Sequence, residues 1–172
     1  MNELLVSELK SAKNDFLEAL ILVEKFVFDK PGISLGLVEE ISQQCQEAIE
    51  NVDEPLEQAS YLINEIFIDH LFIENEQDFW PSKSFQLEHS VNNRFIAPIL
   101  KSAILRHIVT KCGFETDIIS MPERPMLRIV CDDIYAIIFD PINGESLNGF
   151  ELDQKLEDVD ADPYKQQLKL MT

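Results

Sequence analysis

The chain has 172 residues, of which 45% are hydrophobic and 27% charged, with eleven Phe and five Gly, a composition that suits one globular domain and excludes disordered and low-complexity classes. Its 14 Lys and Arg against 32 Asp and Glu give a formal net charge of −18 at pH 7. A field of this sign repels phosphate backbones and anionic lipids, so the sequence predicts no binding to nucleic acid or to membranes.

The negative charge is unevenly distributed along the chain. Residues 1–81 carry 4 basic and 18 acidic side chains (−14), residues 82–130 carry 7 and 4 (+3), and residues 131–172 carry 3 and 10 (−7), which sum to −18. We predict a helical extension over 1–81, a core over 82–160 and an acidic tail or short helix over 161–172, together forming one compact unit.

The first third of the chain predicts three helices, because apolar residues recur there every three or four positions. Pro31 and Gly32 end the first helix, Ser34 caps the second and Pro55 begins the third. The opposite faces are rich in Glu, and we interpret them as solvated surfaces. The predicted inward-facing stripes are Phe16, Leu20, Val23 and Val27; Val38, Ile41, Cys45 and Ile49; and Leu56, Ala59, Ile63 and Ile66.

Two further helices are predicted in the middle of the chain. Ser84 is expected to cap a short helix that runs to Asn93. The next helix, over residues 98–112, has the clearest ends, because Pro98 stands at its first position and Gly113 directly follows it.

After Gly113 the pattern changes to short runs rich in β-branched and aromatic residues, separated by turn-forming residues. We predict an antiparallel three-stranded meander over Thr116–Ser120, Met126–Cys131 and Tyr135–Phe139, and a final helix over Phe150–Glu157. Helices followed by strands predict an α+β fold.

The cysteines and the apolar stretches bear on the compartment. Cys45, Cys112 and Cys131 are odd in number and lack C-x-x-C spacing, which argues against a disulfide scaffold and against a zinc knuckle. The first residues lack the basic region of a signal peptide, and no window approaches the ~18 uninterrupted apolar residues of a membrane span. We therefore expect a reduced, soluble protein of the cytoplasm.

The sequence predicts no metal site and no cofactor. Asp158, Asp160 and Asp162 have the opening of a calcium loop, but Pro163 and Lys169 stand where that loop needs glycine and a bidentate glutamate. The three histidines lack H-x-x-x-H spacing, and the scattered glycines form no phosphate-binding loop.

Four segments, taken in order, resemble the motifs of a known family. They are Asn93–Leu100, Thr110–Phe114, Met121–Arg128 and Phe139–Gly144. Together they resemble the SirB-type bacterial transglutaminase-like family over roughly residues 60–160. The resemblance implies a papain-like core, in which a central helix packs on a small antiparallel sheet.

The resemblance also implies where a catalytic triad would lie. Transglutaminase-like catalysis uses a cysteine at the N-terminus of the central helix, a histidine base and an orienting acid. The matching positions are Pro98, Arg124 and Asp140, of which Pro98 has no nucleophile and Arg124 cannot accept a proton. We therefore expect a degenerate triad with no catalytic residue, beside a candidate cleft formed by Arg124, Asp140, Asn143 and Arg94.

Other side chains are poor substitutes for the missing nucleophile and base. Cys112 lies at the C-terminal end of the helix, where the negative pole raises the pKa of a thiol, and the nearest histidine to Ser102 in sequence, His107, is on the same helix. Asp140 has a structural interpretation, because Asp before Pro commonly binds the amides of the following turn. With Arg124 it is expected to form an ion pair.

Two functions of different classes follow from these features. The first is a non-catalytic protein-interaction or regulatory domain that reuses the transglutaminase-like frame and binds a protein with a basic surface. The alternative is a cysteine-type amide hydrolase or deamidase with displaced catalytic residues. A third interpretation, a charge mimic of nucleic acid, is disfavoured because the acidic residues occupy the solvent faces of amphipathic helices.

Overall fold

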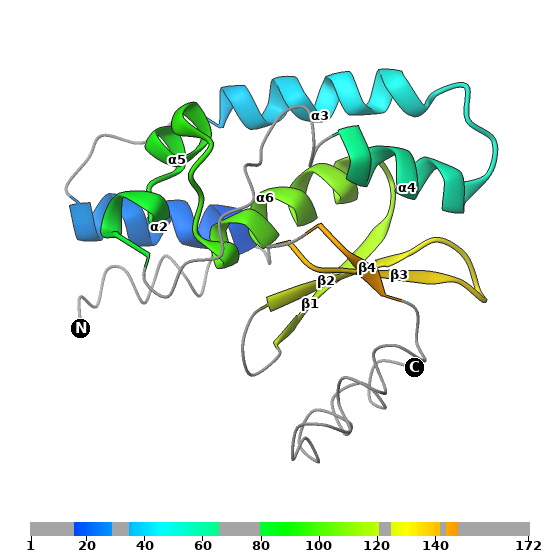
Figure 1. Cartoon of the computed structure of the whole chain (residues 1–172). Coiled ribbons are helices and arrows are strands. Elements are labelled where there is room, and N and C mark those ends of the chain that lie inside the picture. Colours follow the sequence, from blue (N-terminus) through cyan, green and yellow to red (C-terminus); the bar gives the residue numbers. More distant parts are fainter. Residues whose placement is uncertain (1–15, 29–34, 66–79, 121–124, 142–143, 148–172) are drawn as a thin grey trace, which may run out of the picture.

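The fold is an α+β arrangement of two layers, seen in a computed structural model of the whole chain (Figure 1). The structure describes residues 16–28, 35–65, 80–120, 125–141 and 144–147. In Figure 1 the helices form the upper layer and a small antiparallel sheet the lower one. The fold class predicted from the sequence is therefore confirmed.

The first three described helices are α2 (Phe16–Phe28), α3 (Gly36–Ile49) and α4 (Pro55–Asn64). The apolar stripe predicted for α3 is confirmed, because all four of its residues are buried in the core. Pro55 occupies the first turn of α4, as expected from a residue that lacks a backbone N–H. Ser34, proposed as the cap of α3, lies outside the described residues.

The stripe predicted for α2 is partly wrong. Phe16 and Leu20 pack against the core, but Val23 is exposed and Val27 is 61% exposed. The buried side chains are Leu17 and Glu24, so the inward face is rotated from the predicted one. A carboxylate at a core position breaks the apolar pattern from which the sequence prediction was made.

In α4 the predicted stripe is also partly wrong. Ala59 and Ile63 are buried together with Leu62, but Leu56 is exposed at the start of the helix. Ile66 lies outside the described residues.

The buried carboxylate of Glu24 caps a helix far along the chain. A 3-10 turn, η2 (Ser82–Phe85), leads into α5 (Leu87–Asn93), whose N-cap residue Gln86 does not cap the helix with its side chain. Instead, the backbone N–H of Leu87 donates to Oε2 of Glu24 at 2.9 Å. The predicted cap, Ser84, is fully buried and donates to the carbonyl of Pro81 at 2.7 Å, so its prediction as the cap is wrong.

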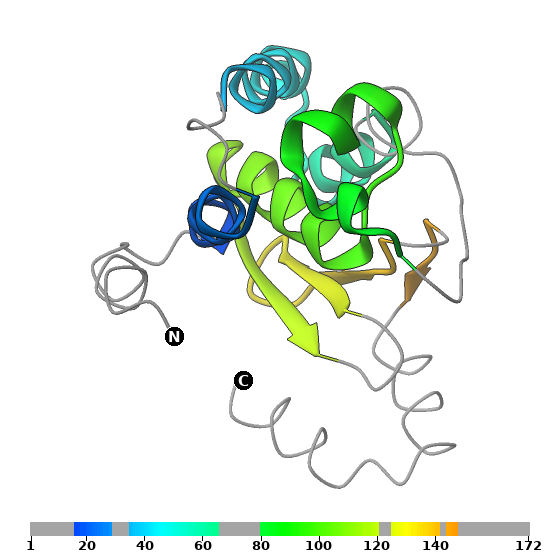
Figure 2. The same cartoon turned by 90° about the vertical axis from the view of Figure 1, so that its left-hand side faces the viewer.

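Helix α6 (Pro98–Lys111) is the central element, and its predicted ends are confirmed to within one residue. Pro98 begins it, Cys112 is its C-cap, and Gly113 follows with φ of +99°, a conformation that side chains on L-residues disfavour. The helix packs against α2, α3, β1 and β2, and Figure 2 shows it between the upper helices and the sheet. Its buried side chains point in most directions, as expected for a helix enclosed by its neighbours.

The sheet has four antiparallel strands in the order β1-β2-β3-β4: β1 (Glu115–Ser120), β2 (Pro125–Val130), β3 (Ala136–Phe139) and β4 (Ser146–Leu147). The predicted three-stranded meander is confirmed, and β4 adds a two-residue strand that the sequence analysis missed. One face of the sheet joins the core under α6 through Ile118, Leu127, Ile129, Ile137 and Phe139.

The helix predicted over residues 150–157 and the tail over 161–172 lie outside the described residues. Within the described part of the chain, none of the helices has the length and apolar character needed to cross a bilayer.

Candidate functional site

The N-terminus of α6 is where the sequence resemblance places a nucleophile. Pro98 is the first residue of the helix, and Ala97 before it has an extended backbone without a side-chain cap. One turn into the helix, the fully buried hydroxyl of Ser102 donates to the carbonyl of Pro98 at 3.0 Å. The hydroxyl of this serine in the first turns of α6 is therefore tied to the helix backbone.

Asp140, the predicted acid, directly follows β3 and is only 1% exposed. Its backbone N–H donates to the carbonyl of Glu145 at 2.8 Å, and its carbonyl accepts the N–H of Gly144 at 2.9 Å. Gly144 has φ of +77°, so glycine suits the turn that carries the chain back into β4. The backbone of Asp140 thus closes the turn, in line with a structural role for this residue.

Of the four proposed cleft residues, the structure describes Arg94 and Asp140, while Arg124 and Asn143 lie outside the described residues. Arg94 is exposed and is the C-cap of α5, with a left-handed φ of +52°. It therefore lies on the surface, in contrast to the buried Asp140. The expected ion pair between Arg124 and Asp140 stays a prediction.

Arg94 directly precedes Phe95, one of two aromatic rings that pack together just before α6. The rings of Trp80 and Phe95 lie 5.2 Å apart between centroids at 34°. Ser90 connects the elements on either side, because its hydroxyl donates to the carbonyl of Lys83 and its carbonyl accepts the N–H of Phe95. We call the set Trp80, Lys83, Arg94 and Phe95 the basic-aromatic patch. Of these four residues, only Arg94 was predicted from the sequence as a candidate cleft residue.

All three cysteines are free thiols that resist ionisation. Burial raises the pKa of Cys45 to about 11, with a contribution from the nearby charge of Glu65. Burial likewise raises the pKa of Cys112 to about 12. The pKa of Cys131 is raised by burial and by Asp132, against a backbone hydrogen bond that lowers it. Near neutral pH, these thiols are protonated and poor nucleophiles.

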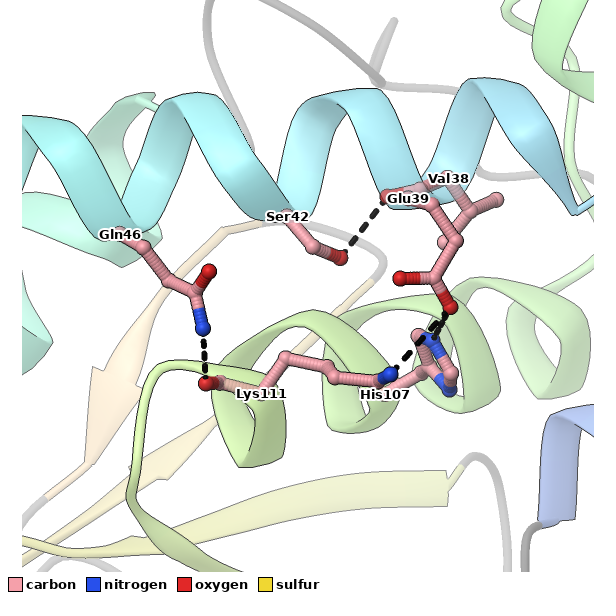
Figure 3. A network of polar contacts seen from close by, with 6 residues as sticks. All are labelled: Val38, Glu39, Ser42, Gln46, His107 and Lys111. Atoms are coloured by element: carbon pink, nitrogen blue, oxygen red, sulfur yellow. Dashed lines mark hydrogen bonds and ion pairs between the residues drawn. The ribbon is translucent and has the colours of Figure 1, made fainter.

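His107 is buried on the side of α6 that faces α3 (Figure 3). Its Nε2 lies 3.1 Å from Oε1 of Glu39, and the same oxygen is 3.4 Å from Nζ of Lys111. Burial acts to raise the pKa of Glu39, but the hydrogen bond with His107 and the charges of Lys111 and His107 outweigh it and hold the pKa below its ordinary value. His107 therefore lies between two helices, where its imidazole contacts the carboxylate of Glu39 on α3.

Two further hydrogen bonds extend this contact along α3. Gln46 donates from Nε2 to the carbonyl of Lys111 at 2.5 Å, and Ser42 donates to the carbonyl of Val38 at 2.8 Å within α3 (Figure 3). We call Glu39, Gln46, His107 and Lys111 the polar seam. The polar seam was not predicted from the sequence, although His107 and Lys111 are four residues apart and therefore share one face of α6.

The polar seam brings the carboxylate of Glu39 and the imidazole of His107 together between two helices. Across residues 16–147, within the ranges that the structure describes, no three His, Cys, Asp or Glu side chains converge in a way that could hold a metal ion.

Comparison with known protein families matches residues 35–172 to the Transglutaminase-like superfamily. The chain belongs to this superfamily. The match spans α3 through the sheet, and the central helix on a small antiparallel sheet agrees with a transglutaminase-like core. Neither the curated proteins nor the solved structures gave a significant match. In this transglutaminase-like chain, the N-terminus of the central helix carries Pro98.

Proposed function

We propose that this protein is a SirB-type transglutaminase-like domain that binds a protein partner and does not catalyse acyl transfer. The observation that carries the proposal is the state of the three thiols, which burial keeps protonated near neutral pH. Nucleophilic catalysis in this superfamily needs a thiolate at the positive end of the central helix. Pro98 occupies that end, and Cys112 is at the opposite end.

The position of the histidine supports the same proposal. His107 faces α3 through its contact with Glu39, while the sheet packs against another side of α6. A base must lie within hydrogen-bond reach of the group that it deprotonates, and Nε2 of His107 is engaged with the carboxylate of Glu39 at 3.1 Å.

The surface of α3, α4 and their connection supports a partner with a basic surface. Residues 35–65 contain eight acidic side chains and no Lys, Arg or His. Leu56 and Tyr61 are exposed on the same segment, so apolar contact is available among the charges. A field of one sign steers an oppositely charged partner and sets its orientation. The exposed acids are Glu40, Glu47, Glu50, Asp53, Glu54 and Glu57.

We also propose that the protein acts in the cytoplasm. Its three cysteines are free, and Cys112 and Cys131 are only partly buried. Thiols of this kind persist in a reducing compartment.

The catalytic half of the proposal is tested with an acyl donor. The purified chain is incubated with p-nitrophenyl acetate and with a glutamine-containing peptide at neutral pH, and intact mass spectrometry follows the protein while released ammonia is assayed. We expect no acyl adduct and no ammonia above the rate of a Cys112→Ala control. A time-dependent acyl adduct on any native side chain would overturn the proposal in favour of a cysteine-type amide hydrolase or deamidase.

The binding half is tested with a charge-neutral variant. Proteins that the immobilised chain retains from host extract are purified. Their affinity is then measured by calorimetry for wild type and for one variant that carries four substitutions, Glu47→Gln, Glu50→Gln, Glu54→Gln and Glu57→Gln. We expect the variant to bind at least tenfold more weakly at low salt, and the difference to shrink as salt screens the charges. Equal affinity of the two chains at low salt would contradict the assignment of this surface.

A further inference from the structure

The connection between β2 and β3 presents two apolar side chains to solvent. Ile134 is 82% exposed and Tyr135 is 55% exposed, next to the carboxylates of Asp132 and Asp133. We call these four residues the hairpin tip. An aliphatic and an aromatic side chain at adjacent exposed positions form a contact surface that a lone exposed residue does not.

The hairpin tip is held in shape by its own hydrogen bonds. Oδ1 of Asp132 accepts the backbone N–H groups of both Ile134 and Tyr135 at 2.7 Å. The carbonyl of Tyr135 accepts the N–H groups of Cys131 and Asp132 at 2.9 and 3.2 Å. A turn with this many internal bonds loses little conformational entropy when it binds.

The basic-aromatic patch is chemically complementary to the hairpin tip. The patch combines two exposed cations, Lys83 and Arg94, with the tilted ring pair of Trp80 and Phe95. The tip combines two carboxylates with an aliphatic and an aromatic side chain. Arg94 has a left-handed backbone with φ of +52° at the end of α5.

The two surfaces lie at opposite ends of the molecule. In Figure 1 the hairpin between β2 and β3 extends at the right, whereas η2 and α5 lie at the left, beyond α6. Within one molecule the tip therefore cannot reach the patch.

We infer that the hairpin tip of one copy docks on the basic-aromatic patch of a second copy. The tip and the patch are different surfaces, so two copies either close both contacts in a two-fold dimer or, joined by one contact, leave a tip and a patch open to which further copies add. The net charge of −18 opposes assembly, and the contact area is small, so we expect a Kd of about 0.1–1 mM. This inference does not depend on whether the domain is catalytic.

The test begins with sedimentation equilibrium of the full chain. Protein at ~0.01 to ~1 mM is studied in ~0.1 M salt, where the Debye length of about 10 Å screens the net charge. The weight-average mass of wild type is expected to rise above that of the monomer as the concentration increases. A tip variant (Ile134→Ser, Tyr135→Ser) and a patch variant (Lys83→Ser, Arg94→Ser) are each expected to remain monomeric. The control variant Lys25→Ser, Val27→Ser removes an exposed cation and an exposed apolar side chain from α2 and should associate as wild type does.

Mixing the two defective variants distinguishes this contact from all others. The tip variant keeps an intact patch and the patch variant an intact tip, so an equimolar mixture should form one-to-one dimers and nothing larger. All four positions are on the surface, and unchanged circular dichroism spectra verify that the variants fold. A wild-type chain that stays monomeric at ~1 mM, or association that one variant abolishes and mixing does not restore, would overturn the inference.

Discussion

The two sides of α6 differ in how they hold their neighbours. Towards the sheet, α6 rests on a face formed by apolar side chains such as Leu127, Ile129 and Phe139. Towards α3, apolar residues share the contact with the polar seam, in which Glu39 meets the imidazole of His107 and the ammonium group of Lys111. Apolar burial supplies most of the stability of a domain, whereas partly exposed ion pairs contribute little. We therefore attribute stability to the sheet side and the placement of α3 along α6 to the seam.

The largest effect is expected on the sheet side, from Phe139→Ala. The side chain is fully buried in the core, and its loss should lower the free energy of unfolding by about 3–5 kcal/mol. The control, Phe85→Ala, removes an exposed ring and should change it by less than about 1 kcal/mol. Both values come from urea unfolding followed by circular dichroism. A similar loss of unfolding free energy in the two variants would contradict the assignment of Phe139 to the core and of Phe85 to the surface.

The next effect concerns Cys45, which is buried on the inner side of α3. Its folded-state pKa of about 11 exceeds the ordinary value of 9.0, so the thiol contributes its full stability below pH 9 and loses it as pH rises towards 11. Wild type should therefore lose of order 1–2 kcal/mol at this site by pH 11. Cys45→Ala lacks this loss, so the stability difference between variant and wild type should narrow between pH 7.5 and 10.5. A constant difference across this range would contradict the burial of the thiol.

A smaller effect is expected from Glu39→Gln in the polar seam. Glu39 is half-exposed, and removing its charge should cost about 0.5–1 kcal/mol at pH 7. Because folding lowers the pKa of Glu39, its contribution is present above the ordinary value of 4.5 and is lost as pH falls through the folded-state pKa. Glu40→Gln, the exposed neighbour on α3, is the matched control. Thermal unfolding at pH 7 and pH 3.5 should separate the two variants only at the higher pH.

The smallest effect is expected from Gln46→Ala. This change removes the hydrogen bond to the carbonyl of Lys111 at the end of α6 and should cost about 0.5–1 kcal/mol. Gln43→Ala is its control, because Gln43 bonds to Glu47 within α3 and does not reach α6. If the two variants were equally stable, the seam would have no measurable role at this end.

The sequence predicts those parts of the fold that depend on neighbouring residues. The ends of α6 follow from Pro98 and Gly113, whose backbone preferences act locally. The inward face of α2 was missed because Glu24 is buried through a partner 63 positions away, which no local pattern records. Strand β4 was missed because two residues are too few to show a period.

In the candidate site, too, the sequence predicts the positions of residues along the chain but not the contacts between distant segments. The order of the motifs led to the superfamily and placed Pro98 at the start of the central helix, where the structure has it. The polar seam and the basic-aromatic patch each combine separate segments of the chain. Spacing along one helix can suggest that His107 and Lys111 share a face, but not that Glu39 meets them.

The bond between Glu24 and Leu87 has a consequence for how this protein opens. Detaching α2 would expose the first amide of α5 and strand a carboxylate, so neither helix can fray alone at that junction. Amides in the two segments should therefore exchange with deuterium at one shared rate, and Glu24→Ala should let them exchange independently.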